Sequence, residues 1–198
     1  REAGQALGGS QYGVLIDAHA KAGDLASAAR WLREMTAAGC DPDPAACSAV
    51  IDAGARGSRW QEALSLLGEA TGASWLPALD EVSFTIIADA CAKQGDAGGA
   101  AHWLGVMEAA RCMPNVVSYN TVIDACAKQG DLGLASRWLG RMLRMGVVPN
   151  EFTYTTMISA CARRQRAAEA AEWLREMAAV QLRPNELSYG AVLDAHAK

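Results

Sequence analysis

A repeat of 35 residues is the feature that most restricts how this chain can fold. The chain reads PNVVSYNTVIDACAKQGDLGLASRWLGRM from Pro114 to Met142, and PNEFTYTTMISACARRQRAAEAAEWLREM from Pro149 to Met177. Self-similarity at a fixed period is typical of arrays in which each unit packs mainly on its two neighbours. We therefore expect small stacked units rather than one large irregular core.

Landmark residues divide the chain into these units. Three residue types recur every 35 residues, at Trp103, Trp138 and Trp173, at Met107, Met142 and Met177, and at Pro114, Pro149 and Pro184. The preceding members, Trp31, Met35 and Pro42, lie 72 residues earlier, which requires two extra residues in the repeat between, within Glu69 to Asp80. The predicted repeats are 9–43, 44–80, 81–115, 116–150, 151–185 and a partial 186–198, and residues 1–8 are the fragment of a preceding segment.

Each repeat is predicted to form two helices. In repeat 116–150, the apolar residues of 118–128 and of 134–142 are spaced three and four apart, as on one helical face. Gly130 and Asp131 predict a turn that ends the first helix and caps the second. Because one helical hairpin cannot bury both of its apolar faces, we predict an all-α fold, an α-solenoid of stacked helix-turn-helix repeats.

Two finer expectations follow from the same pattern. We expect the repeated Trp side chains to be buried on one side of the array, at Trp31, Trp103, Trp138 and Trp173. A hydroxyl residue stands near the start of several first helices, where such residues often act as N-caps. The predicted caps are Ser83, Ser118, Thr153 and Ser188.

The remaining composition argues against several other classes of protein. The net charge is −4, which is unlike a protein that binds nucleic acid through overall positive charge, and no run of 18 apolar residues predicts a membrane span. The six cysteines form no CxxC pair, and Cys91, Cys126 and Cys161 simply follow the repeat, as small buried thiols would. We find no metal-ligand cluster, cofactor motif or catalytic motif, and we expect a protein that is not an enzyme and needs no cofactor.

The repeats resemble those of the pentatricopeptide repeat family. The period of 35, the first-helix sequence VSYNTVIDACAKQG, the glycine turn and the terminal Pro-Asn or Pro-Asp all agree over residues 9–198. The neighbouring tetratricopeptide family has a period of 34 and carries its Trp in the first helix, whereas Trp here lies in the second. The resemblance implies a right-handed superhelix that binds single-stranded RNA, with one base recognised by each repeat.

The resemblance also implies which residues meet the RNA, with positions counted from the first residue of each repeat. In the family, positions 5 and 35 read a base, and position 2 stacks against the bases. The implied base-reading residues are Ser48, Asp80, Thr85, Asn115, Asn120, Asn150, Thr155 and Asn185. The implied stacking residues are Val82, Val117, Phe152 and Leu187. By their residue types alone, positions 5 and 35 are also typical of ordinary solvated residues near helix ends.

The family's base code implies a preferred RNA. It makes Thr85/Asn115 and Thr155/Asn185 readers of adenine and Asn120/Asn150 a reader of a pyrimidine, so that the central triplet is adenine–pyrimidine–adenine. The pair Ser48/Asp80 implies guanine.

A row of cations lies on the same predicted face. Position 13 is basic in every complete repeat, at Lys21, Arg56, Lys93, Lys128 and Arg163. In most repeats an Asp precedes this cation by four residues, which is the favourable order for an ion pair on a helix. The cations are therefore either members of solvated surface pairs or contacts for RNA phosphates.

Two function classes remain open from the sequence. One is a sequence-specific binder of single-stranded RNA that acts in RNA processing, stability, editing or translation in a mitochondrion or chloroplast, with its targeting peptide absent from this chain. The other is a structural subunit that holds proteins together in a large organellar complex. Gly13 and Gly190 at position 5 favour the second class, whereas the regular Thr and Asn pairs of three consecutive repeats favour the first.

Overall fold

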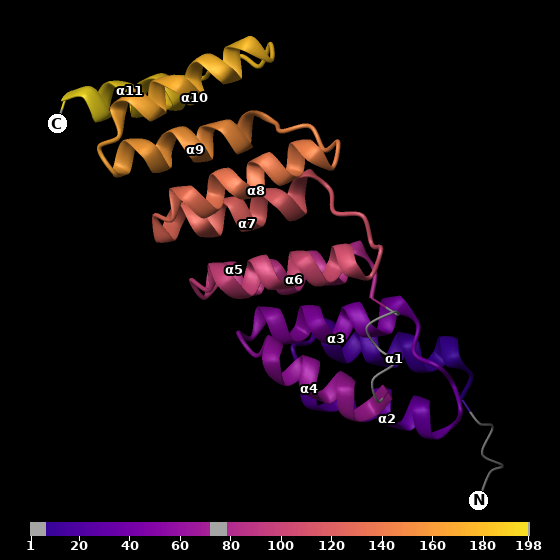
Figure 1. The fold of residues 1–198 in the computed structure, drawn as a ribbon. Coiled ribbons are helices and arrows are strands. Elements are labelled where there is room, and N and C mark those ends of the chain that lie inside the picture. The colour runs from indigo at the N-terminus through magenta and orange to yellow at the C-terminus, as the bar shows by residue number, and fades with distance from the viewer. Residues whose placement is uncertain (1–6, 72–78, 198) are drawn as a thin grey trace, which may run out of the picture. The chain divides into compact units, whose positions relative to one another are not determined.

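The computed structural model describes residues 7–71 and 79–197, and these ranges are entirely helical apart from short connections. Within them the structure has eleven α-helices and no strand, as the repeat pattern predicts (Figure 1). The helices are α1 (Gly9–Lys21), α2 (Leu25–Ala37), α3 (Pro44–Arg56), α4 (Trp60–Thr71), α5 (Glu81–Lys93), α6 (Ala97–Ala109), α7 (Val116–Gln129), α8 (Leu132–Arg144), α9 (Glu151–Arg163), α10 (Ala167–Ala179) and α11 (Glu186–Ala197).

The odd-numbered helices begin with the repeats. Their first residues, from Gly9 of α1 to Glu186 of α11, are the first residues of the six predicted repeats. The two extra residues predicted between Glu69 and Asp80 fall largely on 72–78, which lies outside the described residues, as do residues 1–6 of the N-terminal fragment.

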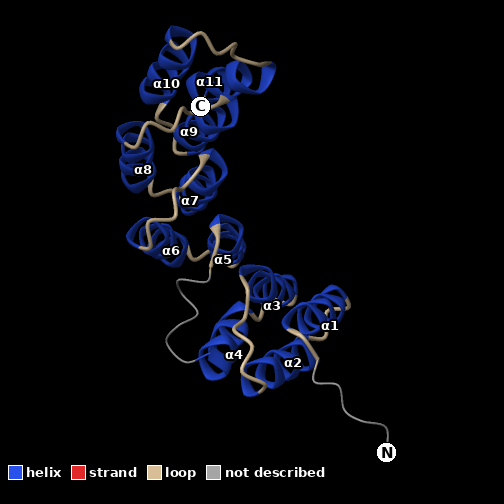
Figure 2. Cartoon of the chain, turned by 90° about the vertical axis from the view of Figure 1, so that its right-hand side faces the viewer, coloured by secondary structure: helices blue, strands red, loops and turns tan. Residues whose placement is uncertain are grey.

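The chain divides into two compact bodies. The N-terminal body comprises 1–90 with 106–113, and the C-terminal body comprises 91–105 with 114–198, so that the division runs through α5 and α6. In the C-terminal body, α7, α9 and α11 pack in sequence, and α8 and α10 cover their other side (Figure 2). In the N-terminal body, α1 packs on α3 and α2 packs on α4. Each body is thus a two-layered stack of helical hairpins.

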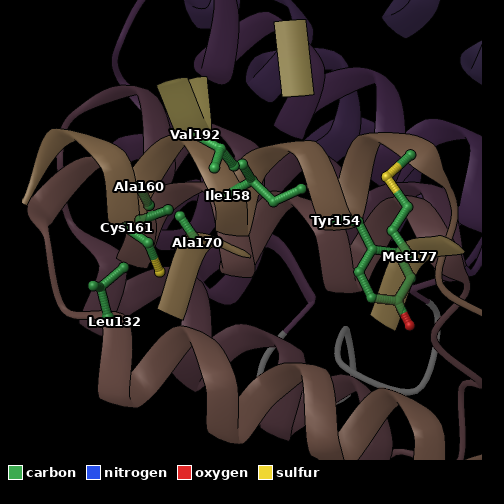
Figure 3. Close-up of a cluster of buried hydrophobic side chains, with 9 residues drawn as sticks. Leu132, Tyr154, Ile158, Ala160, Cys161, Ala170, Met177 and Val192 are labelled. Atoms are coloured by element: carbon green, nitrogen blue, oxygen red, sulfur yellow. The ribbon is translucent and has the colours of Figure 1, made fainter. Parts of the chain in front are cut away.

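Buried apolar side chains join neighbouring hairpins. In the C-terminal body, Tyr154, Ile158 and Cys161 of α9 form one cluster with Met177 of α10 and Val192 of α11 (Figure 3). Cys91, Cys126 and Cys161 are buried free thiols, and burial raises the pKa of each to about 11. These residues therefore serve packing, as their place in the repeat predicts.

The prediction for the tryptophans is right only in part. Trp138 is buried, with 9% of its surface exposed, but Trp31, Trp103 and Trp173 are half-buried. The indole of Trp173 packs against the Tyr154 ring, with 6.4 Å between the ring centroids. Trp lies on the second helices, and a two-layered stack has no further layer to cover the outer part of so large a side chain.

The turn within a repeat has two forms. In repeat 116–150, Gly130 adopts a left-handed backbone (φ 79°), and Asp131 caps α8 by accepting the Leu134 N–H at 2.9 Å, as predicted. In repeat 151–185, Gln165 takes the left-handed conformation (φ 57°), and Arg166 precedes α10 with no side-chain cap bond. The second form is the more strained, because a side chain disfavours positive φ.

The predicted N-caps of the first helices are wrong by three residues. The residue that caps α7 is Asn115, and the residue that caps α9 is Asn150. Ser118 and Thr153 are instead the third residues of these helices, and both are fully buried. The same holds for Ser83 and Ser188, whose backbone N–H groups donate to Asp80 and Asn185. Asp and Asn cap as well as Ser and Thr do, so propensity alone did not distinguish the two positions.

Candidate functional site

Position 35 of each repeat is fixed because its side chain caps the next helix. Asp43 Oδ1 accepts the Ala46 N–H at 2.8 Å, and Asn150 Oδ1 accepts the Thr153 N–H at 3.1 Å. Asp80 accepts the Ser83 N–H in the same way. One oxygen of each side chain is therefore held by the backbone of the next helix, and the cap does not use the second oxygen of the carboxylate or the nitrogen of the carboxamide. We call the residues at positions 5 and 35 of one repeat, together with position 3 of the next, a junction.

The junction of Asn120, Asn150 and Thr153 is a closed hydrogen-bond network. Asn120 Nδ2 donates to Asn150 Oδ1 at 3.1 Å, so that Asn150 Oδ1 receives two donors with the Thr153 N–H. The Thr153 hydroxyl accepts the Asn150 backbone N–H at 3.1 Å and donates to Asn120 Oδ1 at 2.6 Å. The network fixes the orientation of both carboxamide groups. Each carboxamide oxygen accepts a hydrogen bond, and a flipped group would place an N–H where that acceptor is needed.

This junction leaves its polar groups unequally accessible. Asn120 is only 7% exposed, whereas Asn150 is exposed. Within the described part of the chain, the Asn150 Nδ2 group has no hydrogen-bond partner, and Asn120 Nδ2 uses one of its two N–H groups. The edge that a ligand would meet thus combines outward N–H donors with the remaining lone pair of Asn120 Oδ1.

The junction of Thr155, Asn185 and Ser188 is connected through a hydroxyl. The Ser188 Oγ donates to Asn185 Oδ1 at 2.9 Å, and the Thr155 Oγ1 lies 3.2 Å from Ser188 Oγ. Because the Ser188 proton is used by Asn185, Thr155 is the donor to Ser188. Here the predicted pair of positions 5 and 35 is connected indirectly, because both residues are hydrogen-bonded to the Ser188 hydroxyl at position 3.

The junction of Ser48, Asp80 and Ser83 carries a charge. Asp80 Oδ1 accepts the Ser83 N–H at 2.8 Å, the Ser83 hydroxyl at 2.7 Å and the Ser48 hydroxyl at 3.2 Å. Burial on its own raises the pKa of Asp80, but the hydrogen bonds from Ser83 and Ser48 outweigh it and lower this pKa below the ordinary value. The carboxylate is therefore ionised at neutral pH and offers acceptors only.

The remaining predicted reader pair, Thr85 and Asn115, is described one residue at a time. Thr85 donates its hydroxyl to the Glu81 carbonyl at 2.8 Å, and Asn115 caps α7 by accepting the Val117 and Ser118 N–H groups. Thr85 belongs to the N-terminal body and Asn115 to the C-terminal body, and each is described only within its own body.

The predicted stacking residues are apolar side chains exposed in the first turn of their helices. Their exposed fractions are 59% for Val82, 55% for Val117, 54% for Phe152 and 65% for Leu187. In the C-terminal body, Val117 and Phe152 stand three residues before Asn120 and Thr155 of the same helices. An exposed apolar residue at the same place in successive repeats can cover the flat face of a ligand.

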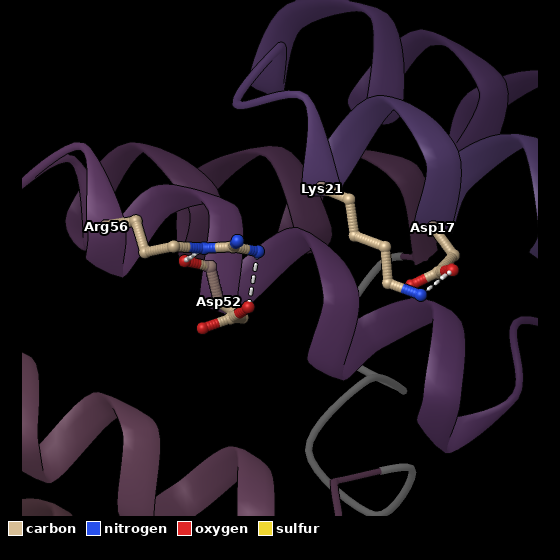
Figure 4. A network of polar contacts seen from close by, with 4 residues as sticks. All are labelled: Asp17, Lys21, Asp52 and Arg56. Atoms are coloured by element: carbon tan, nitrogen blue, oxygen red, sulfur yellow. Dashed lines mark hydrogen bonds and ion pairs between the residues drawn. The ribbon is translucent and has the colours of Figure 1, made fainter.

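The cations at position 13 differ in whether a carboxylate neutralises them. Lys21 Nζ lies 2.7 Å from Asp17 Oδ2, Arg56 pairs with Asp52 in the same way (Figure 4), and Lys128 Nζ lies 2.6 Å from Asp124 Oδ2. These pairs confirm the predicted order of acid and base. Position 9 of the fifth repeat is Ser159, and Arg163 donates only to the Ala127 carbonyl, at 3.5 Å, within the described residues. Lys93 of α5 is also exposed.

Sequence reasoning missed the role of position 3. It identified Ser83, Ser118, Thr153 and Ser188 as caps, whereas their hydroxyls lie within hydrogen-bond distance of the residues at position 35. The hydroxyls of Ser83, Thr153 and Ser188 also contact position 5. The recurrence of a small hydroxyl residue at one position of four repeats was the available signal. No group of three or more metal-ligating side chains occurs among the described residues. None of the helices in those ranges has the length and apolar content that a membrane span requires.

Comparisons with known proteins agree with this geometry. The model of the PPR repeat family matches residues 114–163, that of the pentatricopeptide repeat domain matches 78–129, and that of the PPR repeat matches 12–40 and 152–179. The chain belongs to the pentatricopeptide repeat family. A comparison with curated proteins found no match.

Solved pentatricopeptide repeat structures superpose on most of the chain. Maize PPR10 is similar with a TM-score of 0.82 and 25% identity over 96% of this chain, which corresponds to 27% of the PPR10 chain. PPR10 in complex with an 18-nt psaJ RNA element gives 0.72 and 26% identity over 92% of this chain and 26% of that one. The PPR domain of Arabidopsis thaliana PRORP1 in complex with tRNA shares the fold, with a TM-score of 0.72 and 16% identity over 92% of this chain and 95% of that one. This chain thus spans about a quarter of the length of PPR10.

Proposed function

We propose that this pentatricopeptide repeat chain binds single-stranded RNA and recognises one base with each junction. The observation that carries the proposal is the hydrogen-bonded pair of Asn120 and Asn150, which stands beside the exposed Val117 and Phe152. A fixed pair of polar side chains next to exposed apolar ones suits an unstacked base, which has a polar edge and an apolar face. The similarity to PPR10, which was solved with RNA, supports the same ligand class.

Each base would be held by its face and read at its edge. Val117 and Phe152 belong to successive repeats and would contact the two faces of a base between them. Stacking on an aromatic ring such as that of Phe152 contributes about 1–3 kcal/mol per base and tolerates any base, and Val117 adds apolar contact, so these residues supply affinity. Discrimination comes from the junction, because a wrong edge leaves polar groups unpaired at a cost of about 1–3 kcal/mol.

The chemistry of the junctions supports different bases. The Asn120/Asn150 edge offers donors and an acceptor, which suits a pyrimidine, and the Thr155/Asn185 edge suits adenine by the family code. Asp80 is an ionised acceptor, and guanine is the base whose Watson–Crick edge offers two neighbouring N–H donors. With Thr85/Asn115 as a reader of adenine, the central triplet remains adenine–pyrimidine–adenine.

The phosphates would be contacted by position 13, above all by Arg163. A cation that already pairs with an Asp gains little by exchanging it for a phosphate, whereas Arg163 has no acid at position 9. Because few cations are free in this way, we expect modest, salt-sensitive affinity rather than strong non-specific binding.

The biological role would be to cover or present a short RNA segment during processing, stabilisation, editing or translation in a mitochondrion or chloroplast. We propose that the chain itself is not catalytic and that any chemistry on the RNA is performed by a partner.

One observation favours the second class of function, a scaffold for other proteins. In the C-terminal body, Leu143, Val148, Val180 and Leu182 line an apolar hollow of about 220 Å³. Val148 is 79% exposed and Val180 51% exposed. Apolar surface of this kind is also found where proteins bind one another.

A titration distinguishes the two classes. Short fluorescent RNAs that contain adenine–pyrimidine–adenine would be compared with a scrambled RNA, the same sequence in a duplex and the corresponding single-stranded DNA. The proposal expects the tightest binding to the first RNA and a loss of affinity with salt. Equal and weak binding to all four ligands would contradict RNA recognition and would favour the scaffold.

A further inference from the structure

The residues at position 3 are small hydroxyls buried inside the array. Ser83, Ser118, Thr153 and Ser188 are each 0% exposed, which is unusual for polar side chains near a helix start. A buried hydroxyl is expected to be fully hydrogen-bonded, since an unpaired one is costly. Ser83, Ser118 and Ser188 donate to position 35 of the preceding repeat at 2.7 to 3.4 Å. The Thr153 hydroxyl lies 3.0 Å from Asn150 Oδ1 and is closer to Asn120 Oδ1, which receives its proton.

In the junctions that lie within one body, the hydroxyl also reaches position 5. Thr153 donates to Asn120 Oδ1 at 2.6 Å, and Ser188 accepts from Thr155 at 3.2 Å. In the N-terminal body, the Ser83 and Ser48 hydroxyls are in direct contact. Position 3 therefore contacts position 5 from inside the protein, since its own side chain is fully buried.

The chain contains a natural counterexample. At the junction of Gly13 and Asp43, position 5 has no side chain to orient, and position 3 is Ala46. Asp43 still caps α3 through the Ala46 N–H. The cap therefore does not need a hydroxyl at position 3, so the hydroxyl at the other junctions serves something besides the cap.

We propose that the buried hydroxyl at position 3 is a positioning residue for base recognition, which sets the orientation of the position 5 side chain of the preceding repeat. This inference rests on the proposed function for its consequence in RNA binding. Its structural content, the orientation of Asn120 by Thr153, concerns the free protein.

The reason is clearest for a carboxamide. The terminal torsion of Asn has two broad orientations that differ by half a turn, and this turn exchanges the C=O acceptor for an N–H donor. The Thr153 hydroxyl donates to Asn120 Oδ1, while Asn120 Nδ2 donates to Asn150 Oδ1, so that the two bonds together select one orientation of the carboxamide. Removing the hydroxyl would leave the Asn120 carboxamide held only by its bond to Asn150 Oδ1, so that its orientation would be less well fixed and the edge that it presents to the base less uniform.

Matched variants separate the hydroxyl from packing. Thr153→Val removes the hydroxyl and keeps the branched shape, and Thr153→Ser keeps the hydroxyl and removes the methyl. Thr153→Ala is a second hydroxyl-free variant in case valine impairs folding. Thr121→Val is the control, because Thr121 of α7 donates its hydroxyl only to the Val117 carbonyl, at 3.0 Å.

The first measurement is the order of the Asn120 side-chain amide by NMR in the free protein, with its signal assigned by its loss in Asn120→Thr. A rigid amide is expected in wild type, Thr153→Ser and Thr121→Val. In Thr153→Val or Thr153→Ala the order parameter of this amide should fall clearly below its wild-type value. An equally rigid Asn120 amide without the hydroxyl would overturn the inference.

The second measurement is affinity for four RNAs that differ only in the base opposite Asn120/Asn150. Wild type, Thr153→Ser and Thr121→Val should discriminate among the bases on the order of tenfold, and the hydroxyl-free variants should lose most of this while the mean affinity changes little. Unchanged discrimination in the hydroxyl-free variants would contradict a role in recognition. If wild type itself discriminates against no base, the proposed function fails, while the NMR result still decides the positioning.

Discussion

Two junctions of the molecule share a backbone and differ in almost every polar group. Asp43 and Asn150 both have an extended backbone, and both cap a helix of 13 residues by accepting an N–H three residues ahead. The Asn150 junction adds the side chains of Asn120 and Thr153, whereas the Asp43 junction has Gly13 and Ala46 in their places.

The difference teaches that the scaffold and the recognition groups are separable. The helices start correctly at both junctions because the cap is supplied by position 35 alone. The Asn150 junction has, in addition, a fixed pattern of hydrogen-bond donors and acceptors. We expect that this pattern can be changed without changing the fold.

The largest effect on stability should come from the scaffold rather than from either junction. Trp138→Ala removes a buried indole and should lower the free energy of unfolding by roughly 3–5 kcal/mol, as large aromatic deletions do. Trp173→Ala in the same body is the control and should cost less, because Trp173 is half-buried. Chemical denaturation measures both losses in the free energy of unfolding. Equal losses would show that burial of the indole does not determine how much a tryptophan stabilises the array.

The comparison can be reversed by moving one junction onto the other. Gly13→Asn, Asp43→Asn and Ala46→Ser together place the groups of the Asn150 junction at the Asp43 junction. A Cβ at Gly13 meets no heavy atom within 4 Å, so the side chain has room. The variant should gain a preference for a pyrimidine at that repeat, on the order of 1–3 kcal/mol over other bases.

The control for this transfer is Gly13→Ala with the other two positions unchanged, which adds a side chain without polar groups. Binding is measured with RNAs that vary only at the corresponding base. A triple variant that folds, by its thermal midpoint, and shows no new preference would mean that the junction groups do not act as a transferable reader.

Removing the caps should destabilise the helix start at both junctions and should change base preference at only one of them. Asp43→Ala and Asn150→Ala should each cost about 0.5–2 kcal/mol, since each leaves helix N–H groups without their side-chain acceptor. Only Asn150→Ala should change which base is preferred at its repeat. Thermal unfolding and an RNA panel measure the two effects. A changed base preference in Asp43→Ala would contradict the claim that only the Asn150 junction of the two recognises a base.

The smallest effect should be electrostatic. Arg163→Gln should reduce the salt dependence of RNA binding by about 0.7 in slope, the amount expected for one lost phosphate contact to single-stranded RNA. Neutralising the pair with Lys128→Gln and Asp124→Asn should change the slope much less, because Lys128 Nζ and Asp124 Oδ2 are 2.6 Å apart. Equal slopes for wild type and Arg163→Gln would show that Arg163 is an ordinary solvated surface residue and not a phosphate contact.

Much of the fold could be predicted from the sequence because it depends on repeated apolar spacing. The first helices begin where the period of 35 placed the repeats, and Gly130 and Asp131 form the predicted turn. The exposure of the indoles could not be predicted, because Trp31 and Trp138 occupy the same position of the pattern and differ only in the neighbours that cover them.

The site was predictable as a set of positions but not as a set of bonds. The resemblance to the family named Asn120 and Asn150, which the structure brings to 3.1 Å. It did not name Thr153, because capping propensity gives Ser, Thr, Asp and Asn similar weight and so placed the cap three residues late. In the structure, Asn150 caps α9 and the Thr153 hydroxyl turns inward to Asn120.

The most direct test of the account is a change at Asn120 alone. RNAs bound by wild type and by Asn120→Thr would be selected side by side from one random pool. The account predicts that the middle base of the preferred triplet changes from a pyrimidine to adenine, while the flanking adenines and the thermal midpoint stay as they are. Enrichment of the same middle base by both proteins, or of no base by either, would contradict the claim that this pair reads the RNA.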